Sequence, residues 1–143
     1  MTRLAIGADH AGFALKDELA AALRELGHDV EDLGTHDAQS VDYPDFAHAV
    51  AERVTRGDGT LGLLCCGTGV GMAMAANRHR GVRAVVCSES YSARMARKHN
   101  DANVLCLGAR VVAPGLAREI LDAFLGSAFE GGRHGKRVGK IEP

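Results

Sequence analysis

Five short apolar runs alternate with five segments of helical periodicity along the chain, and this alternation limits the possible folds more than any other feature. Short apolar runs separated by amphipathic helices predict β-α units, which pair in parallel through right-handed crossovers. The sequence therefore predicts a Rossmann-like α/β sandwich of three layers, in which helices cover both faces of a five-stranded parallel sheet. The expected strands are 4–6, 30–33, 61–66, 82–87 and 104–107.

The helical segments carry their own start and stop signals. Leu15, Leu19 and Leu23 lie at helical spacing after the first strand. Pro44 and Pro114 suit the first positions of the second and fifth helices. The remaining helices are expected over 72–79 and 92–99.

Residues 1–143 are expected to form one domain, because no linker, repeat or low-complexity tract interrupts this pattern. Residues 128–143 fall outside it and hold too few apolar groups to fold alone. Within this tail, residues 131–143 carry a formal charge of +3, whereas the whole chain carries −1. The basic tail is thus expected to fray or to dock, either at the active site or on a neighbouring subunit.

The composition excludes several classes of function. A net charge of −1 gives no reason to expect a nucleic acid or an anionic membrane as a partner. No apolar run approaches the length of a membrane span, and Met1 leads directly into a strand-like segment without a signal peptide. The four cysteines lack the spacing of metal ligands. We expect a cytoplasmic protein with reduced, buried thiols.

Polar side chains gather after the predicted strands. In an open α/β sheet, ligands bind beyond the carboxyl ends of the strands. That edge is expected to carry Asp9 and His10 after the first strand, Tyr43 after the second, Cys66 at the end of the third and Arg110 after the fifth. A carboxylate, an imidazole, a phenol, a thiol and a guanidinium are therefore expected at one edge.

Cys66 ends the third strand and opens the loop Gly67-Thr68-Gly69-Val70-Gly71, which leads into a helix. Alternating glycines let the backbone turn tightly around a ligand, and a helix N-terminus offers free N–H donors to an anion. The same positive end favours a thiolate. Cys66 is thus expected to act chemically on a small anionic substrate.

Other interpretations of this loop fit less well. A dinucleotide fingerprint requires a third glycine where this chain has Met72, or Met74 in the other register, and normally follows the first strand. Phosphatases that use a cysteine need an arginine about six residues later, where this chain again has Met72. A packed strand-end cysteine is the remaining alternative, and it suits Cys65 better because adjacent strand residues point to opposite faces.

His99 and Asn100 are expected at the opposite edge of the sheet, because they end the fourth helix just before the fifth strand. Within one chain, His99 would be a helix-end histidine beside the negative end of the dipole. A catalytic role requires a second subunit. Arg133 and Arg137 lie four residues apart, which would put both on one helical face as a phosphate clamp or leave both solvated.

In combination, these motifs resemble type-B ribose-5-phosphate isomerase, whose family also holds galactose-6-phosphate and allose-6-phosphate isomerases. The resemblance covers essentially the whole chain. It rests on the segments Gly7–Gly12, Asp42–Pro44, Cys66–Gly71 with Ala75–Asn77, Arg83–Ser88, His99–Asp101 and Glu130–His134.

The resemblance implies that ribose 5-phosphate and ribulose 5-phosphate are interconverted through an enediolate, without metal or cofactor. Cys66 is then the base, the amides of 67–71 with Thr68 stabilise the oxyanion, and His99 assists opening of the furanose ring. Some members use serine in place of Cys66 and a glutamate four residues later, where this chain has Val70. The family's shared active sites imply a homodimer at least, or a tetramer.

The resemblance also implies the binding residues. Asp9 manages hydroxyl protons, and Asn100 and Tyr43 hold sugar hydroxyls. His10, Arg110, Arg133 and Arg137 supply positive charge or donors around the phosphate. Two alternatives stay open: a six-carbon aldose phosphate as the substrate, and a non-catalytic module that binds phosphate or nucleotide on the same fold.

Overall fold

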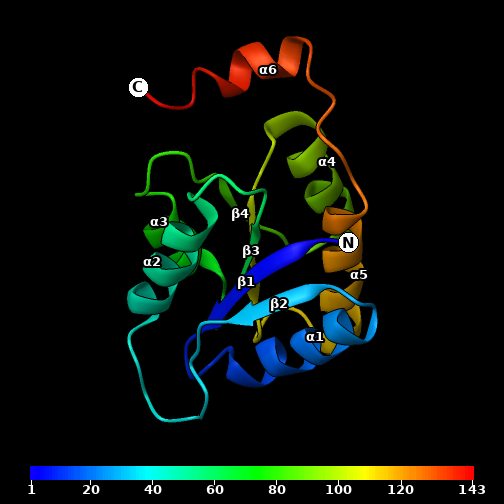
Figure 1. Cartoon of the computed structure of the whole chain (residues 1–143). Helices are drawn as coiled ribbons and strands as arrows, with labels where there is room; N and C mark the ends of the chain where they lie inside the picture. The colour runs from blue at the N-terminus through cyan, green and yellow to red at the C-terminus, as the bar shows by residue number, and fades with distance from the viewer.

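Five parallel strands form one sheet in the order β2-β1-β3-β5-β4, and helices cover both of its faces (Figure 1). The computed structural model describes all residues, 1–143. The strands are β1 (Arg3–Ala8), β2 (Asp29–Asp32), β3 (Leu61–Cys66), β4 (Ala84–Val86) and β5 (Val104–Gly108). The helices are α1 (Phe13–Glu25), α2 (Tyr43–Val54), α3 (Val70–Ala76), α4 (Ser90–Asn100), α5 (Pro114–Leu125) and α6 (Arg133–Val138). None of them combines the length and the hydropathy needed to cross a membrane. The predicted fold class is confirmed.

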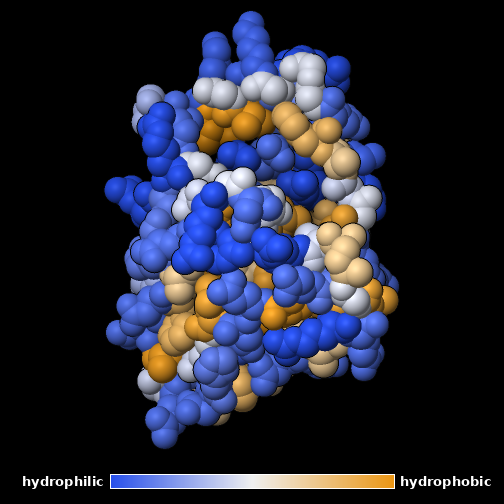
Figure 2. Space-filling view, viewed as in Figure 1, coloured by the Kyte–Doolittle hydropathy of each residue, from blue (hydrophilic) through white to orange (hydrophobic).

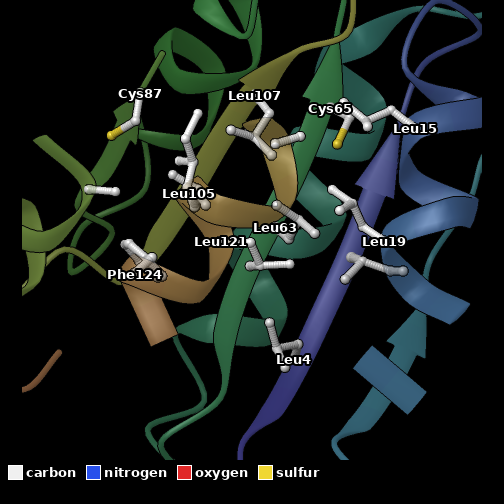
Figure 3. Packing of buried hydrophobic residues seen from close by; sticks show 14 of the residues in the cluster. Leu4, Leu15, Leu19, Leu63, Cys65, Cys87, Leu105, Leu107, Leu121 and Phe124 are labelled. Atoms are coloured by element: carbon white, nitrogen blue, oxygen red, sulfur yellow. The ribbon is translucent and has the colours of Figure 1, made fainter. Parts of the chain in front are cut away.

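Two apolar cores lie on the two faces of the sheet. The larger core joins the sheet to α1, α4 and α5 through residues such as Leu19, Leu105 and Phe124, as Figure 3 shows. The smaller core joins the other face to α2 and α3. Because successive strand residues point to opposite faces, Cys65 belongs to the larger core and Cys66 to the smaller one.

The strand order reverses at β1: β2 lies on one side of β1, and β3 and the later strands lie on the other. From β1 the chain crosses to α1 on one face, and from β3 it enters α3 on the other. The loops after these two strands therefore leave in opposite directions and open a crevice between them. This crevice is where a doubly wound sheet binds its ligand.

Helix α3 begins and ends earlier than the predicted range of 72–79. It begins at Val70 because Gly69 takes a left-handed conformation, with φ of 82°, that turns the chain directly into the helix. It ends at Ala76 because the side-chain amide of Asn77 forms two hydrogen bonds, of 2.9 and 2.8 Å, with the backbone of Ala84. These bonds draw the chain into β4.

The tail is ordered against its own chain. It forms the short helix α6, which packs beside α4 and arches over the molecule in Figure 1. Further along, the carboxylate of Glu142 accepts a hydrogen bond of 2.8 Å from the backbone N–H of Gly81. The tail thus spans from the end of α4 to the turn after α3.

Lys16 of α1 is completely buried at the base of the loop that leads from β2 to α2. Its Nζ donates to both carboxylate oxygens of Asp32 at 2.8 Å and to the carbonyl of Thr35 at 2.7 Å. A buried ammonium is tolerated only when it is paired and hydrogen-bonded in this way. Lys16 therefore ties α1 to the start of the loop that leads to Tyr43, the first residue of α2.

We expect Lys16→Ala to lower the free energy of unfolding by about 3 kcal/mol, because it leaves a largely buried carboxylate without its counter-charge. Urea denaturation measures this loss. The control is Lys136→Ala at an exposed position, which should change stability by less than about 0.5 kcal/mol. Equal stability of the two variants would contradict the structural role of the buried ammonium.

Candidate active site

A cleft of about 320 Å³ opens at the carboxyl ends of the strands, where β1, β3 and β5 meet. An adjoining hollow of about 480 Å³ shares Asp9 and Tyr43 with it and adds His10. The structure thus brings together the side chains expected at this edge. The cleft itself is lined by Asp9, Tyr43, Cys66, Gly67, Thr68, Gly71 and Arg110.

Cys66 is the only one of the four cysteines that lines the cleft, although just 5% of it is exposed. The backbone N–H of Gly69 donates to its Sγ at 3.1 Å. The other three thiols are held protonated: burial raises the pKa of Cys65 to about 12, that of Cys87 to about 11 and that of Cys106 well above its ordinary value. Because the thiolate is the nucleophile, these three thiols are poor nucleophiles at neutral pH.

The amides of the glycine loop divide into two groups. Those of Gly69 and Val70 are used inside the loop, by Cys66 Sγ and by Thr68 Oγ1 at 3.2 Å. Those of Gly67 and Thr68 donate to no protein acceptor. Gly67 and Thr68 line the cleft, whereas Gly69 and Val70 do not, so the two free loop amides are those at the cleft.

Asp9 and His10 are both held by backbone amides. Asp9 Oδ1 accepts N–H bonds from Ala11 and Gly12 at 2.9 and 3.0 Å, which leaves its second oxygen available to the cleft. His10 Nδ1 accepts an N–H bond of 3.1 Å from Val41. A ring nitrogen that accepts carries no proton, so His10 is the neutral tautomer with its donor at Nε2.

Tyr43 and Arg110 lie over two glycines of the loop. A Cβ on Gly71 would lie 2.3 Å from Cε1 of the Tyr43 ring, so this ring occupies the space that any side chain at position 71 would need. The Arg110 guanidinium lies over Gly67, and its Nη1 is 3.3 Å from the point where a Cβ on Gly67 would lie. Arg110 makes no ion pair within the chain, which leaves its charge available to an anion.

Four predicted site residues lie apart from this cleft. His99 and Asn100 end α4, and Arg133 and Arg137 are exposed on α6. Asn100 lines a different hollow of about 420 Å³, together with Arg83 and the last residues of the tail. Docking of α6 beside α4 gathers these four residues into a second group on the same chain.

No role was predicted from the sequence for Glu130 or His134, yet both contact His99. The His134 ring stacks on the His99 ring with centroids 4.2 Å apart, and one carboxylate oxygen of Glu130 lies 3.6 Å from His99 Nε2. The segment Glu130–His134 is part of the resemblance described above, but neither that motif nor the spacing of four residues indicates which helix the pair meets.

An α/β fold with a thiol in the cleft between β1 and β3, free backbone N–H donors beside it and an unpaired guanidinium suits the class of enzymes that move protons on a small anionic substrate. Comparisons with known proteins identify the family within this class. The family model of the ribose/galactose isomerases matches residues 4–141. This chain belongs to that family.

Relatives and solved structures agree over nearly the full length. Ribose-5-phosphate isomerase B of Escherichia coli is 52% identical over 99% of this chain and 95% of its own. A putative sugar phosphate isomerase of Bacillus subtilis is 44% identical over 97% and 94%. The structure of Clostridium thermocellum ribose-5-phosphate isomerase B superposes with a TM-score of 0.96 at 53% identity, over 98% of this chain and 95% of the other.

We expect iodoacetamide at neutral pH to modify Cys66 before any other cysteine, because only this sulfur lines a cleft and the pKa values of Cys65 and Cys87 lie near 12 and 11. Peptide mass spectrometry locates the label. The Cys66→Ala protein should stay unlabelled on the same time scale. Modification of Cys65 at a comparable rate would overturn the assignment of the reactive thiol.

Proposed function

We propose that this chain interconverts ribose 5-phosphate and ribulose 5-phosphate by proton transfer through an enediolate. The observation that carries this proposal is the position of Cys66 at the cleft, beside the two loop amides that have no protein acceptor. A structure related to this chain, ribose-5-phosphate isomerase B of Mycoplasma genitalium, was solved with bound ribulose-5-phosphate. It is 43% identical, with a TM-score of 0.94, over 98% of this chain and 93% of the other.

In the proposed reaction the Cys66 thiolate removes the proton from C2 of the open-chain aldose. The electron pair of that bond forms the C1–C2 double bond, and the carbonyl oxygen on C1 takes up the negative charge. The N–H groups of Gly67 and Thr68 stabilise this oxyanion, and the Gly69 N–H at 3.1 Å stabilises the thiolate. Returning the proton to C1, while a proton leaves the hydroxyl on C2, gives the ketose.

Asp9 is the group that we propose for the hydroxyl protons. Its Oδ1 is held by two backbone N–H groups, so the carboxylate cannot turn away from the cleft. The second oxygen can accept a proton from one substrate hydroxyl and return it to another. Thr68 Oγ1 accepts the Val70 N–H, so its own hydroxyl proton remains available as a donor.

The phosphate is proposed to bind through both neutral and positively charged donors. His10 offers a neutral Nε2–H, and Arg110 offers a guanidinium that is not neutralised within the chain. Arg133 and Arg137, which are exposed on α6, add two further positive charges when a second subunit brings them to the cleft. Tyr43 and Asn100 are left to bind sugar hydroxyls.

A homodimer, or a tetramer built from it, is proposed because the groups needed for ring opening lie outside the cleft of their own chain. His99, the proposed acid, belongs to the second group at the end of α4. The outer face of α3 next to the cleft exposes Val70 and Met74, 45% and 67% accessible. Figure 2 shows hydrophobic residues exposed near the top of the molecule. The exposed Ile141 lines the hollow of about 420 Å³ with Val82 and Val85. A second copy of the chain would cover both surfaces.

This chemistry requires no metal or cofactor, and we propose none. All four cysteines are free thiols, which agrees with the reducing cytoplasm that we propose as the location. Residues 1–143 are proposed to act as one domain, since both cores are built on one sheet.

The six-carbon alternative follows from the family description, which names galactose beside ribose. A panel of ribose 5-phosphate, allose 6-phosphate and galactose 6-phosphate separates the candidates by kcat/KM. We propose that the five-carbon substrate ranks first. A higher kcat/KM for either six-carbon substrate would replace it, and no turnover of any would refute the proposed function.

We expect Cys66→Ala to lower kcat by roughly 10³-fold, within the usual range for loss of a general acid-base group. Binding of substrate should remain measurable by calorimetry, since the amides and arginines persist. The matched control is Cys65→Ala, whose side chain points into the opposite core, and it should be nearly fully active. A Cys66 variant with near-native kcat, measured by ultraviolet detection of ribulose 5-phosphate, would show that another group is the base.

We also expect a mixture of Cys66→Ala and His99→Ala subunits to regain activity. In a hybrid dimer one of the two sites combines an intact Cys66 with an intact His99 from the partner. Half of the dimers in an equimolar mixture are hybrids at complete exchange, so activity should approach about a quarter of that of the native dimer. Native mass spectrometry confirms the exchange. If exchanged subunits stay inactive, the shared site is wrong.

A further inference from the structure

A stacked pair of imidazoles joins the tail to the end of α4. The rings of His99 and His134 lie 4.2 Å apart and within 7° of parallel. One carboxylate oxygen of Glu130 lies 3.6 Å from His99 Nε2 and 3.7 Å from His134 Nε2. Three titratable groups from two segments of the chain thus share one small space.

The pair is anchored, and its two members differ in exposure. The backbone N–H of Glu130 donates to the carbonyl of Lys98 at 3.0 Å, which holds the tail against the last turn of α4. The side chain of His134 is 9% exposed, whereas that of His99 is 40% exposed. One face of the His99 ring is therefore covered by His134, while part of the ring stays open to a ligand.

Two imidazoles stacked at this distance cannot both carry a charge without strong repulsion. Burial is the main cause that lowers the pKa of His134, and the charges of His99, Arg133 and Arg137 lower it further, against Glu130, which raises it. His134 Nε2 is also buried without a hydrogen-bond partner, where a proton with its charge would be poorly solvated. These groups, from α4, α6 and the segment before α6, are the ones that face the pair.

We propose that His134 is a positioning residue for His99: its neutral ring sets the plane of the His99 imidazole and leaves on His99 the one positive charge that the pair can carry, with Glu130 as the counter-charge. This inference rests on the proposed function, in which His99 donates a proton to the ring oxygen of the furanose. The same contact docks α6, so His134 also sets where Arg133 and Arg137 stand.

A metal ion is the competing use of this cluster, since the three ligand atoms lie within 4.8 Å of one another. The stacked geometry favours a role in proton transfer over the binding of a metal ion. The nitrogen lone pairs lie in the planes of their rings, and two nearly parallel planes do not meet near the nitrogens, whereas a zinc ion must lie close to both planes at about 2 Å from each nitrogen. Binding of one ion would require a ring to turn out of the stack.

The test compares His134→Ala, His134→Phe and Glu130→Gln with the exposed control His36→Ala. Phenylalanine keeps a neutral stacked ring, whereas alanine removes it. We expect kcat to fall at least tenfold in His134→Ala and to return within about threefold of the native value in His134→Phe, with the control unchanged. If His134→Phe is as impaired as His134→Ala, or if His134→Ala is fully active, the positioning role is overturned.

Glu130→Gln tests the counter-charge by a measurement that needs no activity. In an NMR titration of the His134 side chain, we expect the midpoint to move to lower pH, because Glu130 raises the pKa of His134 and its loss as a negative charge disfavours the protonated ring. The decline of kcat with rising pH should move the same way. An unmoved midpoint overturns the inference alone, whereas a moved midpoint in a protein that isomerises no sugar phosphate refutes only the proposed function.

Zinc binding tests the competing use of the cluster. Stoichiometric binding of Zn²⁺ that is lost in both Glu130→Gln and His134→Phe would establish a metal site and overturn the positioning role.

Discussion

The site depends on backbone hydrogen bonds that join the ends of three strands beyond the regular sheet. Asp9 N–H donates to the Cys65 carbonyl at 3.2 Å, and Ala109 N–H donates to the Cys66 carbonyl at 2.8 Å. Their approach is so close that a Cβ on Gly12 would lie 2.2 Å from the Cys65 oxygen. The carboxylate of Asp9 and the thiol of Cys66 are thereby held on rigid backbone rather than on mobile loops. The guanidinium of Arg110, one residue after Ala109, is held in the same way.

The second group of functional residues is organised by different forces. His99 sits at the end of a helix, and a tail with few apolar residues is held there by one backbone bond, a ring stack and a shared carboxylate. Such contacts are weaker than core packing and depend on charge. Under the proposed function, the base therefore stands on the most rigid part of the fold, while the acid and the phosphate clamp belong to a part that a second subunit and the substrate can adjust.

Much of the first group was predictable from the sequence because it follows from topology. Parallel strands place all their carboxyl ends at one edge, so Asp9, Tyr43, Cys66 and Arg110 were expected together and lie together. The uses of individual loop amides were not predictable. That Val70 N–H is consumed by Thr68 Oγ1, and that His10 is a neutral donor, depends on atomic distances that no spacing rule contains.

By itself, the sequence determined the α/β class, the strand-end position of the chemistry and the separation of His99 from Cys66, because these follow from periodicity and from the direction of parallel strands. Only the tertiary structure decided which face each neighbouring cysteine joins in the packed cores, how buried Lys16 ties α1 to the loop before Tyr43, and that Glu130 and His134 meet His99. The physical reason is the separation along the chain of the residues that interact. Local patterns encode interactions within a few residues, whereas burial, stacking and charge pairing arise between segments that only the fold brings into contact.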